Sequence, residues 1–172
     1  MLFFALLAIT ALGLRSLARI GRLSTMMGWP RCIRGGLMIS LLVIGTDHLL
    51  NPDRYIPMIS GFMPYPKEIT YFTGFCEILG AIGLAHPRTR RAAGYMLALY
   101  FICVFPANIS NAAYGIHAQG LPEARWYYLL RLPMQPLAII AALIAGNIAS
   151  LRGTVRGIIQ VVRITLLPER PY

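Results

Sequence analysis

Apolar residues form four long runs along the chain, and short polar segments separate them. The runs cover about residues 32–50, 69–85, 92–113 and 126–149. Each is as long as the roughly 17 to 25 mostly apolar residues that an α-helix needs to cross a bilayer. The pattern therefore predicts an all-α membrane protein, with a bundle of four transmembrane helices over residues 32–149.

Residues 1–14 are also apolar, but this run is too short to span a bilayer by itself. It lacks the basic start and the small-residue cleavage site of a signal peptide. We expect residues 1–31 to be an apolar and basic segment that lies at the membrane interface or is partly inserted. A fifth, tilted span that runs on towards Leu23 and a start assigned too far upstream are the alternatives.

The tail, residues 150–172, has polar residues at helical spacing. Arg152, Arg156, Gln160 and Arg163 recur every three or four residues, and apolar residues occupy the remaining arc. This pattern is typical of a basic amphipathic helix on a membrane surface, which we expect over residues 155–167. Anionic lipid of the cytoplasmic leaflet is the predicted partner of this helix.

The composition agrees with a membrane protein, because 57% of the residues are hydrophobic and only 13% are charged. The net charge of +10 comes mainly from arginines beside the apolar runs, so we predict no nucleic-acid partner. These arginines precede the first run, fill the second connection and follow the last run. Because basic residues favour the cytoplasmic side, both termini of a four-span chain are predicted to be cytoplasmic.

Glu77 and Arg131 each interrupt an apolar run. A charge at the centre of a bilayer costs roughly 2.5 to 3.5 kcal/mol, so an intramembrane charge indicates a functional site or a buried pair. Counting the helical rise of about 1.5 Å per residue from the outer ends places Glu77, Asn108, Arg131 and Gln135 in one layer. We therefore predict that Glu77 and Arg131 form an ion pair, completed by Gln135 or Asn108.

Three further polar residues, Asp47, His48 and Asn111, lie near the outer ends of their runs. The whole polar set has two interpretations. It is either a structural network that fixes the helices, or an outward-facing pocket that binds a polar head group or moves protons. His48 is the residue best suited to titrate near neutral pH. Asn108 and Asn111 lie beside Pro106, which is expected to kink its helix and leave a carbonyl to be satisfied.

The cysteines, Cys32, Cys76 and Cys103, are far apart and show neither a C-x-x-C motif nor a zinc-binding spacing. No metal site is predicted, and a disulfide-exchange enzyme is disfavoured. We expect each cysteine to be a small buried hydrophobic residue, with a spatial pair of Cys76 and Cys103 as the alternative.

Several strings in residues 45–135 are similar to those of the DoxX family of membrane proteins. They are the His48-Leu49-Leu50-Asn51-Pro52 segment with Tyr55, the segment Thr73-Gly74-Phe75-Cys76-Glu77-Ile78-Leu79-Gly80, Pro87-Arg88-Thr89-Arg90-Arg91, Val104-Phe105-Pro106-Ala107-Asn108-Ile109, and Leu130-Arg131-Leu132-Pro133-Met134-Gln135. The resemblance implies a four-helix bundle of the bacterial cytoplasmic membrane. It also implies a link to a thiosulfate:quinone oxidoreductase subunit and to redox or stress-response assemblies, but no agreed catalytic residues.

These observations lead to one functional expectation. We expect an outward-facing pocket that binds a quinone or another small polar molecule, with Glu77 and Arg131 as its core and His48 as the titrating group. Asn108 and Gln135 would supply hydrogen bonds, and a homodimer or redox partner subunits are the expected protein partners. No reaction is assigned. A small-molecule or proton-coupled transporter and a non-catalytic scaffold subunit are the alternatives.

Overall fold

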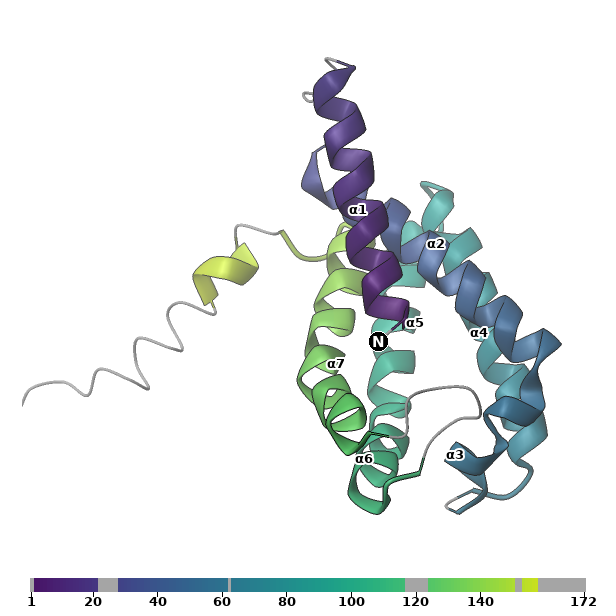
Figure 1. Ribbon diagram of the computed structural model, residues 1–172. Helices are drawn as coiled ribbons and strands as arrows, with labels where there is room; N and C mark the ends of the chain where they lie inside the picture. Colours follow the sequence, from purple (N-terminus) through teal and green to yellow (C-terminus); the bar gives the residue numbers. More distant parts are fainter. Residues whose placement is uncertain (1, 22–27, 62, 117–123, 151–152, 158–172) are drawn as a thin grey trace, which may run out of the picture.

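The protein is all-helical in the part of the chain that the structure describes, a computed structural model covering residues 2–21, 28–61, 63–116, 124–150 and 153–157 (Figure 1). The helices, in chain order, are α1 (Leu2–Ile20), α2 (Trp29–Leu50), the 3₁₀ helix η1 (Pro52–Arg54), α3 (Ile56–Ser60), α4 (Pro66–Ala85), α5 (Arg90–Cys103), α6 (Phe105–Tyr114) and α7 (Arg125–Ala145). The all-α prediction is confirmed. Helices α2, α4, α5 with α6, and α7 correspond to the four predicted runs.

Among the described residues, five helical segments are long and apolar enough to cross a membrane, which indicates a multi-pass membrane protein. The segment that adds to the four predicted runs is α1, which has 19 residues. The sequence predicts an apolar segment that is shorter than this helix, because Arg15 and Arg19 interrupt the apolar pattern. The helical backbone nevertheless continues to Ile20. This length suits the fifth-span alternative as well as an interfacial helix.

Helix α1 runs antiparallel to α2. Its first residues, including Leu2 and Phe3, lie near Asp47 at the carboxyl end of α2. Its later residue Arg15 lies over the ring of Trp29, the first residue of α2, with 5.7 Å between the guanidinium carbon and the ring centroid. Figure 1 shows the far end of α1 projecting beyond the other helices.

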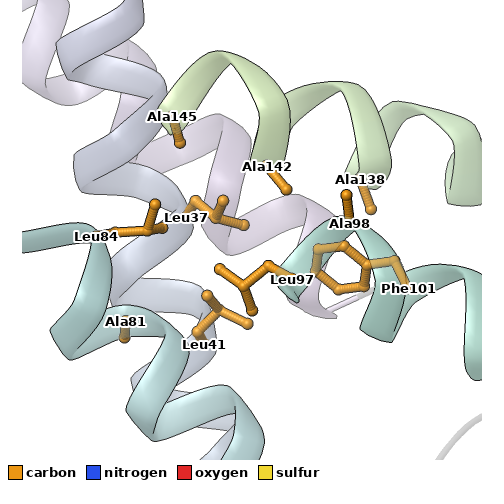
Figure 2. Packing of buried hydrophobic residues seen from close by; sticks show 10 residues of the cluster. All are labelled: Leu37, Leu41, Ala81, Leu84, Leu97, Ala98, Phe101, Ala138, Ala142 and Ala145. Atoms are coloured by element: carbon orange, nitrogen blue, oxygen red, sulfur yellow. The ribbon is translucent and has the colours of Figure 1, made fainter. Parts of the chain in front are cut away.

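The core packs leucines from several helices against small residues of α7. Figure 2 shows Leu97 and Phe101 of α5 facing alanines of α7, with Leu37 and Leu41 of α2 beside them. Ala138, Ala142 and Ala145 are almost completely buried. Without a long side chain in this stripe, α5 and α2 can approach α7 closely. The alanine face of α7 is therefore the face that packs into the bundle.

Helices α2 and α4 approach most closely at two glycines. A Cβ atom at Gly45 would lie 2.9 Å from the carbonyl oxygen of Gly74, and one at Gly74 would lie 2.9 Å from the carbonyl oxygen of Gly45. A Cβ atom at Gly74 would also lie 3.0 Å from the Cβ of His48. Glycine at both positions therefore brings His48 against α4.

The third predicted span is divided at Val104 into α5 and α6. Pro106, in the first turn of α6, has no backbone N–H, so the helical ladder cannot pass through it unbroken. The predicted irregularity at Pro106 is confirmed. Helix α7 contains Pro133 and Pro136 and still continues from Arg125 to Ala145.

Arginines join the helix ends on the side opposite to the polar residues. The Nε of Arg34 donates a hydrogen bond to the carbonyl oxygen of Ala145 at 2.7 Å, and its Nη2 donates one to Oδ1 of Asn147 at 2.7 Å. The Nε of Arg90 donates to the carbonyl oxygen of Leu84 at 3.1 Å. These contacts satisfy carbonyls that a helix leaves unpaired at its carboxyl end.

In the connection between α2 and α4, Pro52 is the first residue of η1 and Pro57 lies in the first turn of α3. In the tail, residues 153–157 are helical. Most of the predicted amphipathic helix, residues 158–167, lies outside the described residues.

A candidate ligand site inside the bundle

All seven polar residues singled out from the sequence line one cavity of about 210 Å³. They are Asp47, His48, Glu77, Asn108, Asn111, Arg131 and Gln135, and they come from α2, α4, α6 and α7. The structure thus brings together residues up to 88 positions apart in the sequence, from Asp47 to Gln135. Their role in binding stays a prediction.

Glu77 is buried, and each of its carboxylate oxygens has a partner. Oε2 lies 2.9 Å from Nδ1 of His48, and Oε1 accepts a hydrogen bond of 2.9 Å from the hydroxyl of Tyr100. Among the ion pairs of the described residues, Glu77 pairs with His48 and not with Arg131. The predicted Glu77–Arg131 ion pair is therefore wrong. The contact of Gly45 with Gly74 explains the change, because each glycine lies three residues before one member of the observed pair, on the same helix face.

Arg131 reaches the cavity from α7 and makes no ion pair with the described part of the chain. Its guanidinium carbon lies over the ring of Tyr128, 5.9 Å from the ring centroid. A ring face attracts a cation but does not neutralise it. The cavity therefore holds an arginine whose guanidinium N–H groups can donate hydrogen bonds to an oxygen of a ligand or of water.

Two of the amide side chains, Asn108 and Gln135, form hydrogen bonds within the protein, whereas the side-chain oxygen of Asn111 forms none with the described residues. Nε2 of Gln135 donates to the carbonyl oxygen of Phe101 at 2.7 Å, and Nδ2 of Asn108 donates to Oε1 of Gln135 at 3.2 Å. Phe101 lies in the last turn of α5, so Gln135 satisfies a carbonyl beside the break at Val104. Oδ1 of Asn111, in contrast, is buried and has no hydrogen-bond partner among the described residues. A buried acceptor of this kind is unfavourable until a donor reaches it.

A second cluster, around Asp47, lies at the end of the cavity beside η1. Nη1 of Arg54 donates to Oδ2 of Asp47 at 2.9 Å, Nδ2 of Asn51 donates to Oδ1 at 2.8 Å, and the hydroxyl of Tyr55 also donates to Oδ2. The ring of Tyr55 packs against that of His48, with 4.2 Å between their centroids. Burial, and then the hydrogen bond to Asp47, raises the pKa of Tyr55 well above its usual range. Tyr55 therefore stays a neutral donor, and Asp47 is already occupied.

Sequence alone does not single out Arg54, Tyr55, Tyr100 or Tyr127, which also line the cavity. Tyr100 lies within an apolar run, where a tyrosine resembles any other large hydrophobic residue. The signal for Tyr55 is its position seven residues after His48 in a proline-rich connection. Leu2, Phe3 and Phe4 of α1 also line the cavity and give it an apolar wall.

The cysteines form no disulfide in the described part of the chain. Cys32 is buried as expected, Cys76 is half-buried, and Cys103 is exposed, so the prediction of burial is wrong for Cys103. Within the described ranges no group of three or more His, Cys, Asp or Glu side chains could hold a metal ion.

Comparison with known proteins places the site within a defined family. The model of a family described as a domain of unknown function, DUF8561, matches residues 37–148, which is more than half of the chain. The chain belongs to this family. The matched region contains every polar residue of the cavity, whereas α1 lies outside it. No curated protein and no solved structure matches the chain.

Proposed function

We propose that this multi-pass protein binds a small polar-headed molecule in its intramembrane cavity, with a quinone head group as the first candidate. The observation that carries the proposal is that an arginine without an ion-pair partner and a buried acceptor without a hydrogen bond among the described residues line the same cavity. Arg131 makes no ion pair with the described residues, and Oδ1 of Asn111 is buried without a partner. A ligand oxygen would accept hydrogen bonds from Arg131, and a hydroxyl, which a quinone head group carries in its reduced quinol form, would donate one to Asn111.

The location of the cavity supports a ligand that arrives from the lipid or from the outer side. The cavity lies at the end of α2 that continues into residues 51–65, opposite the end where Arg34 and Arg90 cap helices. With the arginine-rich end in the cytoplasm, the cavity faces outward, in the cytoplasmic membrane of a bacterium. The apolar wall from α1 suits the isoprenoid side of a quinone.

The resemblance to DoxX proteins suggests where this binding is used, namely in a redox or stress-related membrane assembly. Partner subunits, a homodimer and anionic lipid at the tail belong to the same proposal. We assign no reaction to the chain.

A scaffold subunit without a ligand is the second candidate, because part of the polar network is complete within the protein. Glu77 has two protein partners, and Gln135 links α7 to α5. A scaffold needs this network only for stability. The two candidates therefore differ in whether Arg131 matters for binding or only for folding.

The test is the binding of a short-chain ubiquinone analogue to the purified full chain in lipid nanodiscs. We expect saturable binding that weakens at least about tenfold in Arg131→Gln, since hydrogen bonds to a charged group contribute about 1.5 to 3 kcal/mol. Arg88→Gln is the matched control, because Arg88 is exposed in the connection between α4 and α5 and does not line the cavity. Equal affinity in both variants, or no saturable binding of any small polar probe, would leave the scaffold as the better proposal.

A further inference from the structure

The charges that line the cavity suggest which ligand it takes. The four charged side chains in its lining are Asp47, Glu77, Arg54 and Arg131, and they sum to zero while His48 is neutral. Arg54 is paired with Asp47 at 2.9 Å. This leaves Glu77 and Arg131 as separate charges of opposite sign, each in the cavity but not in contact as an ion pair.

An anion would gain from Arg131 but would be repelled by Glu77. Charges interact strongly where water is excluded, so a second negative charge near Glu77 is unfavourable. His48 provides the remedy, since its Nδ1 lies 2.9 Å from the Glu77 carboxylate. With Nδ1–H donated to Glu77, a proton taken up at Nε2 converts the contact into an imidazolium–carboxylate pair with no net charge.

We propose that the cavity binds a small carboxylate-headed molecule with an apolar body, and that each molecule is bound together with one proton held by the His48–Glu77 pair. This proposal rests on the proposed function and names the ligand class and its regulation by pH. A carboxylate matches the planar guanidinium of Arg131 with two parallel hydrogen bonds. The ligand and proton together add no net charge to the cavity.

The other titratable groups around the pair do not compete for this proton. Asp47 accepts hydrogen bonds from Arg54, Tyr55 and Asn51, and Tyr55 is a neutral donor to it. Tyr100 donates to Glu77, and Arg131 carries a fixed positive charge. The titratable groups that line the cavity, taken element by element, are Asp47 and His48 from α2, Arg54 from η1 and Tyr55 beyond it, Glu77 from α4, Tyr100 from α5, and Tyr127 and Arg131 from α7. The described lining residues of α1, α3 and α6 add no titratable group.

The apolar body is indicated by the apolar wall that α1 contributes to the cavity. Leu2, Phe3 and Phe4 of α1 line the cavity, and the ring of Phe3 lies 5.7 Å from that of Phe101 between centroids. A wall of aromatic rings suits a flat apolar group. Benzoate has both features, and benzamide has the same shape without the charge.

The experiment is calorimetric titration of the full chain in nanodiscs with benzoate and with benzamide. Titration in two buffers that differ in ionisation enthalpy measures the protons taken up. We expect benzoate to bind more tightly than benzamide at about pH 6, with the benzoate affinity falling by up to about tenfold per pH unit once the pair has lost its proton. Proton uptake should approach about one per benzoate in that range.

Two variants separate this linkage from a structural role. Glu77→Gln removes the repelling charge, so its benzoate affinity at about pH 8 should exceed that of the unmodified protein and should vary less with pH, because His48 no longer has a carboxylate partner. His48→Gln keeps the repelling charge, so its affinity should be weak at every pH. A merely structural network predicts no gain of affinity in Glu77→Gln. Arg88→Gln should behave as the unmodified protein.

The outcomes also separate this inference from the function on which it rests. If the ubiquinone analogue binds through Arg131 but benzoate binds no better than benzamide, the carboxylate inference is wrong and the ligand site stands. Benzoate binding without proton uptake overturns the linkage. If neither probe binds, both proposals fail.

Discussion

At the residue scale, the partner of the buried Glu77 carboxylate determines how the polar network contributes to stability. Side chains in contact commonly show coupling energies of about 0.5 to 3 kcal/mol, whereas separated side chains are nearly additive. Because Glu77 lies 2.9 Å from His48, we expect a double-mutant cycle of Glu77→Gln with His48→Leu to give coupling of about 1 kcal/mol or more. The free energy of unfolding in mixed micelles is the quantity to measure.

The control is the same cycle with Arg131→Met in place of His48→Leu. Since Arg131 makes no ion pair with the described residues, its coupling to Glu77 should be smaller than that of His48. The opposite order would restore the direct Glu77–Arg131 pair.

Sequence alone predicts which residues meet in the cavity but not which of them pair. The helical rise fixes depth, so Glu77, Arg131, Asn108 and Gln135 were correctly placed near one another. Pairing depends on how each helix is rotated, and here the Gly45–Gly74 contact turns His48 towards Glu77. A protonated His48 and Arg131 both have the charge opposite to that of Glu77, so charge alone does not decide which of them pairs with it.

At the element scale, the close crossing of α2 and α4 depends on the absence of side chains at Gly45 and Gly74. A Cβ at Gly45 would lie 2.9 Å from a backbone oxygen of α4, which cannot move without shifting the helix. We expect Gly45→Ala to destabilise the fold by about 1 to 3 kcal/mol and to weaken the His48–Glu77 contact. Thermal unfolding of the detergent-purified protein would measure this loss.

Gly13→Ala is the matched control, because a Cβ at Gly13 in α1 meets nothing within 4 Å. Alanine favours a helix over glycine by roughly 0.5 to 1 kcal/mol, so this variant should be neutral or slightly more stable. Similar losses in both variants would show that the α2–α4 contact is not specially tight.

Helix positions were more predictable than helix ends, for reasons visible in α5, α6 and α1. The length of an apolar run sets the span, and Pro106 marks the irregularity between α5 and α6. Arg15 and Arg19 ended the apolar pattern of the first segment, but arginine is a good helix former, so α1 continues to Ile20. Hydropathy indicates which part of a helix can lie in the lipid, whereas the helix itself continues until a residue interrupts its backbone hydrogen bonds.

At the scale of the whole molecule, the path of α1 determines on which side of the membrane the amino end lies. Helix α1 is antiparallel to α2, and its first residues line the same cavity as His48. If α1 crosses the membrane, its amino end lies on the side of residues 51–65, and Arg15 and Arg19 lie with the other arginines in the cytoplasm. This arrangement keeps the positive-inside bias and places the ends of a five-span chain on opposite sides.

We therefore expect a reporter fused after Tyr172 to be cytoplasmic and one fused before Met1 to be extracytoplasmic. Phosphatase and fluorescent-protein fusions, which are active on opposite sides of the cytoplasmic membrane, would measure both ends in the same cells. A fusion within residues 86–89, between α4 and α5, is the internal control and should report the cytoplasm. Cytoplasmic signals from both ends would instead show that α1 enters and leaves by the same side, as the interfacial or partly inserted segment predicted from its short apolar run. A phosphatase signal after Tyr172 would contradict the orientation altogether, and with it the proposal that the cavity faces outward.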